Sequence, residues 1–217
     1  MNRSNLHVSI DAEEEIVISG IAGRFPNTNN LKELQDNLFN KMDLGTKEHG
    51  RWNNYFDMPS RIGKIDNIEK FDSQFFNIST IEADMLDPMA RMVLEHTYEA
   101  LVDAGVNPKQ LRGTKTGIFT AICADAYSGS IYSNPNLGGV PPYWCNRAFV
   151  ANRISYWLGV NGPSYNMDAA CSSSLFAITE AYRYIQAGQC DAAIVATSNL
   201  CVHPFINFGF YKLGMHL

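Results

Sequence analysis

A single cysteine lies among small residues in the segment MDAACSSSLFAI, which runs from Met167 to Ile178. Cys171 follows two alanines and precedes three serines, so the neighbouring side chains leave room for another molecule to approach its sulfur. A free cysteine that only fills space behaves as a small buried hydrophobe. Two interpretations of Cys171 therefore stand, a nucleophilic thiol and a buried structural thiol, and the spacing alone leaves both open.

The elements expected around Cys171 indicate what a thiol would meet there. Residues 161–170 are expected to turn and then extend as a strand, whereas the apolar spacing after the cysteine predicts a helix ended by Gly188. A thiol at a helix start faces unpaired backbone N–H groups and the positive end of the helix dipole, which favour the thiolate. The Cys171 N–H would also help to stabilise an oxyanion. Asp168 is expected to cap or orient this turn, or to make a purely structural hydrogen bond.

Strands and helices are expected to alternate along the chain. Apolar runs predict buried strands at residues 16–23, 115–122 and 191–200. A surface helix is predicted near residues 31–38, and another helix follows Cys171. A long helix is predicted from the capping pair Ser79 and Glu82 to Gly105, with Pro88 near its start. A further helix is predicted over residues 144–160, where Ala148, Ala151 and Ile154 are expected to pack closely. Residues 42–76 and 128–142 are expected to be loops. This order predicts an α/β fold with a mostly parallel sheet covered on both faces.

Composition and charge exclude several classes of function. The 217 residues are 46% hydrophobic and carry a net charge of -5, without a run of Lys or Arg. We therefore expect neither a nucleic-acid nor a membrane partner. Residues 1–15 are polar and are expected to form a flexible acidic arm, and they lack the apolar region of a secretory signal. The sequence predicts a cytoplasmic protein.

The cysteines argue against disulfides and metal sites. They are odd in number and widely spaced, with no C-x-x-C pair and no histidine cluster at zinc spacing. We therefore expect free thiols in a reducing compartment, with no metal and no bound cofactor. The five cysteines are Cys123, Cys145, Cys171, Cys190 and Cys201.

The segment GPSYNMDAACSSSL, residues 162–175, resembles the active-site signature of β-ketoacyl synthases, the condensing domains of animal-type fatty acid synthases and modular polyketide synthases. Further segments resemble the same family in order and spacing, so that the resemblance runs from about Ile16 to Met215. They are IVISGIAGRFPNTNNLKEL, LDPMARMVLEHTYEALVDAG, LRGTKTGIFTAI, NRAFVANRISYWLGVNGPS and GQCDAAIVATSNL. The phrases RFPNTNNL and RIGKIDNIEKFDSQFF are closer to animal fatty acid synthase than to bacterial stand-alone enzymes.

The resemblance implies a thiolase-like fold, in which two βαβαβ-type halves stack around a double sheet. Residues 16–217 would be the first half, incomplete at the C-terminus. Cys171 would accept an acyl group from the phosphopantetheine thiol of an acyl carrier protein, and the acyl group would then condense with a decarboxylating malonyl carrier. The family also implies a homodimer, with residues 124–147 near its interface and beside the acyl pocket. An uncovered apolar face is expected to make the isolated chain associate.

The sequence departs from the family in two ways. Ala169 stands where the family commonly has Thr, and neither family setting of the two catalytic histidines occurs. The five histidines are His7, His49, His96, His203 and His216. We expect structural roles for His96, which lies on a predicted helix, and for His203, which precedes Pro204. We therefore expect this chain alone to be incompetent for condensation. Two alternatives remain open, a piece of a polyketide synthase and an inert truncated chain that pairs with a full-length subunit.

Overall fold

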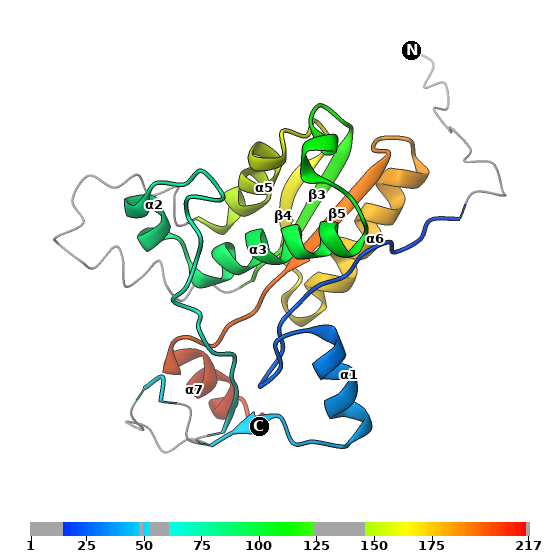
Figure 1. The fold of residues 1–217 in the computed structure, drawn as a ribbon. Helices are drawn as coiled ribbons and strands as arrows, with labels where there is room; N and C mark the ends of the chain where they lie inside the picture. The colour runs from blue at the N-terminus through cyan, green and yellow to red at the C-terminus, as the bar shows by residue number, and fades with distance from the viewer. Residues whose placement is uncertain (1–14, 48–49, 53–60, 124–145, 216–217) are drawn as a thin grey trace, which may run out of the picture.

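A three-stranded parallel sheet forms the centre of the computed structural model, which describes residues 15–47, 50–52, 61–123 and 146–215. Strand β3 (Thr116–Ala121) lies between β4 (Ser164–Met167) and β5 (Ala192–Thr197) and pairs in parallel with both. The predicted α/β class with a parallel sheet is therefore confirmed. Because all three strands run the same way, their carboxyl ends meet at one edge of the sheet (Figure 1).

Helices cover both faces of this sheet. Helices α3 (Pro88–Asp103) and α5 (Val150–Leu158) lie on one face, and α6 (Ser173–Gln186) lies on the other (Figure 1). All six residues of β3 are buried, and they alternate between two clusters. Ile118 packs with the α3 and α5 side, whereas Phe119 packs with α6. A continuous apolar strand is what a sheet covered on both faces requires.

The helix predicted to start at Ser79 is two helices. Helix α2 (Thr80–Met85) begins with the expected bond, from the Glu82 N–H to Ser79 Oγ at 3.2 Å. It ends before Asp87, whose Oδ1 accepts the Met89 N–H at 2.7 Å and so caps α3. The prediction of one continuous helix is wrong because Pro88 has no N–H to continue α2 and is suited to the first position of a new helix.

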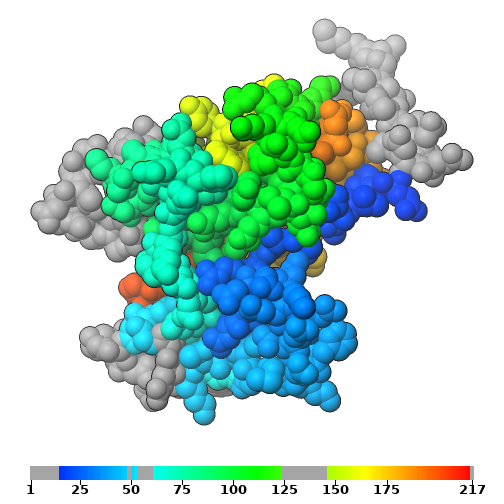
Figure 2. Space-filling view, viewed as in Figure 1, coloured from blue at the N-terminus to red at the C-terminus, as the bar shows by residue number. Residues whose placement is uncertain are grey.

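Residues 16–23 were expected to form a buried strand, and this prediction is also wrong. The segment is extended but pairs with no strand in the part of the chain that the structure describes, and the side chains of Val17 and Ile18 are 70% and 79% exposed. It runs along α3 instead, where the Ile21 N–H donates to Asp103 Oδ2 at 2.9 Å. A Cβ at Gly20 would lie 2.2 Å from the carbonyl oxygen of Ala100, so only glycine permits this approach. Figure 2 shows the segment passing beside α3 to the lower part of the molecule.

The remaining described elements lie mostly below the sheet in Figure 1. Helix α1 (Leu31–Phe39) is the predicted surface helix, and the Glu33 N–H donates to Oδ1 of its cap, Asn30, at 2.8 Å. The two-residue strands β1 (Gly45–Thr46) and β2 (Ile62–Gly63) pair within the predicted loop over 42–76, and α7 spans Pro204–Lys212. Short 3-10 turns cover Pro108–Leu111 (η1), Arg147–Phe149 (η4) and Ala170–Ser172 (η5).

One prediction concerns side-chain packing in the helix over 144–160, and two others concern segments outside the described residues. In the predicted helix over 144–160, Ala151 and Ile154 are fully buried as expected, but Ala148 is exposed because it lies in η4, before α5 begins. The arm at residues 1–14 and the loop at 128–142 fall outside the described residues. Among the described residues, no helix is long and apolar enough to cross a membrane, and no group of three His, Cys, Asp or Glu side chains is arranged to hold a metal ion.

Candidate active site

Cys171 lies in the turn that joins β4 to α6, at the carboxyl edge of the sheet. Strand β4 ends at Met167, the turn η5 covers Ala170–Ser172, and α6 begins at Ser173. The predicted order of strand, cysteine and helix is therefore confirmed. Cys171 is exposed, and no residue in the described ranges hydrogen-bonds to its sulfur. A thiol in this position is open to a substrate that approaches the edge of the sheet.

The residue before Cys171 has an unusual backbone conformation. Ala170 has a φ of 51°, in the left-handed region that an L-residue with a Cβ seldom occupies. Such a conformation persists only where the surroundings hold it. The Ala170 N–H donates to Asp168 Oδ1 at 3.1 Å, and the Ala170 carbonyl accepts the Ser173 hydroxyl at 2.7 Å. Hydrogen bonds to neighbouring side chains therefore hold both the N–H and the carbonyl of Ala170.

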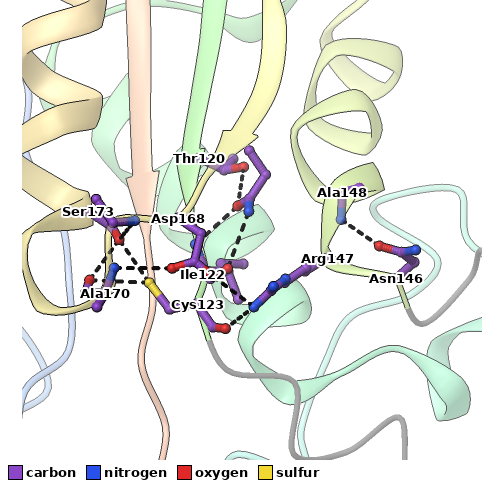
Figure 3. Close-up of polar contacts among 11 residues, drawn as sticks. Thr120, Ile122, Cys123, Asn146, Arg147, Ala148, Asp168, Ala170 and Ser173 are labelled. Atoms are coloured by element: carbon purple, nitrogen blue, oxygen red, sulfur yellow. Dashed lines mark hydrogen bonds and ion pairs between the residues drawn. The ribbon is translucent and has the colours of Figure 1, made fainter.

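Ser173 joins three parts of the turn. Its side chain is buried, and its Oγ accepts the Ala169 N–H at 2.7 Å while donating to the Ala170 carbonyl. The sulfur of Cys123, which follows β3, lies 2.9 Å from the same Oγ and 3.3 Å from the Ala170 oxygen. The Cys123 thiol therefore packs against the turn that carries Cys171 (Figure 3).

An ion pair completes the site. Arg147, from η4, lies 3.1 Å from Asp168 Oδ2 and also donates to the Cys123 carbonyl (Figure 3). The hydrogen bond from the Ala170 N–H, followed by the Cys123 side chain and the charge of Arg147, holds the pKa of Asp168 below its ordinary value. Asp168 is therefore ionised at neutral pH and makes the hydrogen bond that the sequence suggested for it.

The other described cysteines are less accessible than Cys171. Cys190 is buried, and burial raises the pKa of its thiol. Burial also raises the pKa of Cys201, which is partly exposed. Cys123 is partly exposed and engaged with Ser173, and Cys145 lies outside the described residues. Among the described thiols, Cys171 is the exposed one at a helix start.

The two described histidines have local partners. His203 caps α7, because its Nδ1 accepts the Phe205 N–H at 3.2 Å. The Nδ1 of His96, on α3, lies 2.8 Å from Glu99 Oε2, whereas its buried Nε2 has no hydrogen-bond partner among the described residues. Neither histidine hydrogen-bonds to Cys171. His7, His49 and His216 fall outside the described residues.

Sequence reasoning did not single out Arg147, Cys123 or Ser173, although Arg147 and Ser173 lie in segments that resemble the family. Cys123 was one of several equivalent free thiols. Cys123 reaches the turn because β3 and β4 are adjacent and end at the same edge of the sheet, and Arg147 reaches it because η4 packs against β4. The signal that was available is the position of Cys123 directly after an apolar strand.

Comparison with known proteins identifies the family. The model of the β-ketoacyl synthase N-terminal domain matches residues 13–217. The chain belongs to the β-ketoacyl synthase family. It is 42% identical to the fatty acid synthase of the goose Anser anser anser over 204 residues, which cover 93% of this chain and 58% of that relative. It is 35% identical to the polyketide synthase PksN of Bacillus subtilis over 213 residues, which cover 93% of this chain and 4% of that synthase.

Solved structures agree with this assignment. A ketosynthase from module 6 of the bacillaene synthase of Bacillus subtilis superposes with a TM-score of 0.81 at 32% identity, over 90% of this chain and 33% of that chain. An oxazolomycin ketosynthase domain from Streptomyces albus gives a TM-score of 0.83 at 31% identity, over 93% of this chain and 38% of that chain. The fold is therefore thiolase-like, and this chain spans little more than a third of the solved ketosynthase chains it matches.

Proposed function

We propose that Cys171 accepts an acyl group from the phosphopantetheine thiol of an acyl carrier protein, as the first step of chain elongation in fatty acid synthesis. The observation that carries this proposal is the exposed thiol of Cys171 at the junction of β4 and α6. Membership of the β-ketoacyl synthase family supports the reaction class. The activity is that of a 3-oxoacyl-[acyl-carrier-protein] synthase, an acyltransferase.

The proposed acyl transfer needs no bound cofactor, because the bond that forms is matched by the bond that breaks. The Cys171 thiolate attacks the thioester carbonyl carbon, and its sulfur forms a new bond to that carbon. The bond from the carbon to the carrier sulfur then breaks, and the carrier leaves as a thiolate that takes up from water the proton released when the Cys171 thiol ionised. The backbone N–H groups of Ser172 and Ser173 donate to the carbonyls of Ala169 and Ala170, whereas the Cys171 N–H donates to no described acceptor and is available to stabilise the oxyanion. The small side chains of Ala169 and Ala170 leave room for the thioester.

The second proposed step is condensation of the acyl group with a malonyl unit that loses carbon dioxide. This step needs groups that promote decarboxylation, and His96 and His203 are held by contacts of their own. We therefore propose that the 217 residues alone take up an acyl group but do not condense it. The complete domain would act as a cytoplasmic homodimer with an acyl carrier protein.

A polyketide product is the second candidate. Its support is that the solved ketosynthases similar to this chain belong to the bacillaene and oxazolomycin systems. The identity to the goose fatty acid synthase, 42%, exceeds that to PksN, 35%, and favours fatty acid synthesis. A comparison of linear acyl carriers with hydroxylated or branched ones as acyl donors would separate the two candidates.

The test supplies acyl and malonyl carrier proteins to this chain and to a version extended to the length of its relatives. We expect acylation of Cys171 in both samples, detected by peptide mass, and release of β-ketoacyl product and carbon dioxide only from the longer one. Acid-base and oxyanion groups each contribute roughly 10²- to 10⁴-fold in rate, so the short chain should stay near background.

The variant Cys171→Ala should lose both acyl uptake and condensation. Acylation of another residue would refute the role of Cys171. Condensation by the short chain that disappears in Cys171→Ala would instead show that the decarboxylating groups lie within these 217 residues.

A further inference from the structure

Arg147 and Asp168 approach the turn around Cys171 from different elements. Arg147 lies in η4, just before α5, and Asp168 follows β4. Their side chains meet at 3.1 Å, and each is 39% exposed. In Figure 3 the Asp168 carboxylate lies between the Arg147 guanidinium on one side and the Ala170 backbone on the other.

Asp168 uses its two carboxylate oxygens for different partners. Oδ2 faces Arg147, while Oδ1 accepts the N–H of Ala170 at 3.1 Å. Ala170 is the left-handed residue, with a φ of 51°, and it is bonded directly to Cys171. A rotation of the Asp168 carboxylate would release the Ala170 N–H and leave the strained conformation held only through the Ala170 carbonyl. The position of the Cys171 thiol therefore depends on the orientation of this carboxylate.

Arg147 also ties the turn to the neighbouring strand. Its guanidinium donates to the carbonyl of Cys123, the second residue after β3, while the Cys123 sulfur lies 3.3 Å from the Ala170 oxygen. The contacts form a closed ring that passes through Arg147, Cys123, Ala170 and Asp168. Both contacts are made by one guanidinium nitrogen, Nη1, which therefore links the carboxylate and the carbonyl through a single group.

We propose that the ion pair between Arg147 and Asp168 is a clamp that positions Cys171 for acyl transfer. The clamp keeps Ala170 left-handed and thereby holds the Cys171 thiol toward the approaching thioester. Neither side chain touches the reacting atoms, so both are positioning residues. This inference rests on the proposed role of Cys171 as the acyl acceptor.

The exposure of the pair distinguishes positioning from overall stabilisation. Ion pairs that remain partly solvated contribute little to the stability of a fold. Reaction rates respond far more strongly, because a displacement of about 1 Å of a reacting group can cost around 100-fold. Loss of the clamp should therefore slow the reaction of Cys171 while leaving thermal unfolding almost unchanged.

The test compares Asp168→Asn and Arg147→Gln with the unchanged chain in acylation by an acyl carrier protein. We expect the kcat of acylation to fall about 10- to 100-fold in each variant, with KM within twofold. The double variant should be no slower than the slower single variant, because each single change already removes the same ion pair. Arg147→Lys keeps a positive charge but loses the fixed direction of the Nη1 donor, and compared with Arg147→Gln it should recover part of the rate.

A matched control removes an ion pair on α6, the helix that follows the turn. Arg183 and Glu180 pair at 3.0 Å on the surface of α6, away from the turn. Arg183→Gln should leave the acylation rate within twofold. The thermal midpoint is measured for every variant, because a fall in the midpoint that parallels the loss of rate would overturn the clamp in favour of general destabilisation.

Alkylation by iodoacetamide separates this inference from the proposed function. The rate of Cys171 alkylation, followed by peptide mass, should fall in Asp168→Asn and Arg147→Gln whether or not acyl carriers react. An unchanged alkylation rate in both variants would overturn the clamp. Slower alkylation together with no acyl transfer to Cys171 in the unchanged chain would support the clamp and refute the acyl-acceptor role.

Discussion

The two faces of the central sheet are covered by different kinds of helix surface. On the face of α3 and α5, large side chains such as Met89, Leu94 and Ile154 are almost completely buried. On the opposite face, α6 meets the sheet through the small residues Ala177 and Ala181 and through Tyr184, whose ring lies 5.2 Å from that of Phe119. The first face is a large aliphatic core, whereas the second is a smaller cluster of alanines and aromatic rings.

The outer surface of α6 sharpens the contrast. Its large apolar side chains point away from the sheet and are exposed, at Leu175, Phe176, Ile178 and Tyr182. Cys171 lies just before this helix. The packed core and the proposed nucleophile are therefore separated in this chain, with the core on one face of the sheet and Cys171 before the helix that presents an apolar surface.

The largest effect should come from the packed face. Ile154→Ala, at a fully buried position on α5, should lower the free energy of unfolding by about 2–5 kcal/mol, because it leaves a cavity in a dense core. Leu175→Ala on α6, at a position 68% exposed, should change it by less than about 0.5 kcal/mol. Urea unfolding of both variants measures the difference, and equal losses would contradict the contrast between the faces.

Thiol labelling tests the chemistry assigned to the start of α6. Under limiting iodoacetamide, Cys171 should react at least about tenfold faster than Cys190 and Cys201, whose pKa values are raised by burial. Peptide mapping of the folded chain gives the order, with urea-unfolded chain as the control in which the preference should disappear. Label spread evenly over the cysteines of the folded chain would count against Cys171.

The apolar surface of α6 should make the isolated chain self-associate. Replacing Leu175 and Ile178 together by lysine should weaken association roughly tenfold or more, because two large apolar groups no longer leave water. Val102→Lys, at a position on α3 that is 55% exposed, is the matched control and should change association little. Sedimentation measures the effect, and a monodisperse monomer at every concentration of the unchanged chain would refute this prediction.

The smallest effect concerns the titration of Asp168. Its folded pKa lies below the ordinary value of 3.8, so any stability it supplies is present above that value and is lost as the pH falls through the lowered one. Cys123→Ala should bring the pKa back toward 3.8, and Arg147→Gln should do so to a smaller extent. Carboxyl NMR titration measures both changes, and a midpoint unaffected by either substitution would show that the Ala170 N–H alone causes the shift.

Much of the fold could be predicted from local patterns. Capping residues located the starts of α1 and α2, glycines marked the ends of α3 and α6, and the apolar run at residues 115–122 identified β3. The failures have physical causes. The run at residues 16–23 has the composition of a strand, but a strand exists only where a neighbour supplies its hydrogen bonds.

The periodicity of α6 illustrates a different limit. Its apolar spacing correctly predicted a helix, but the same spacing could not say which face meets the sheet. Ala177 and Ala181 lie on the buried face with Tyr184 packed beside them, whereas Leu175, Phe176, Ile178 and Tyr182 are exposed. Hydrophobic periodicity therefore identified the element without fixing its orientation.

The sequence by itself predicted Cys171 as the candidate nucleophile, because small neighbours and a strand-to-helix junction are local properties of the residues around it. Only the tertiary structure decided what surrounds it. Parallel pairing of β3 with β4 brings Cys123 and Asp168 to one edge of the sheet, and the packing of η4 against β4 brings Arg147 to the same place. Contacts between distant segments depend on sheet register and helix packing, which no local pattern encodes.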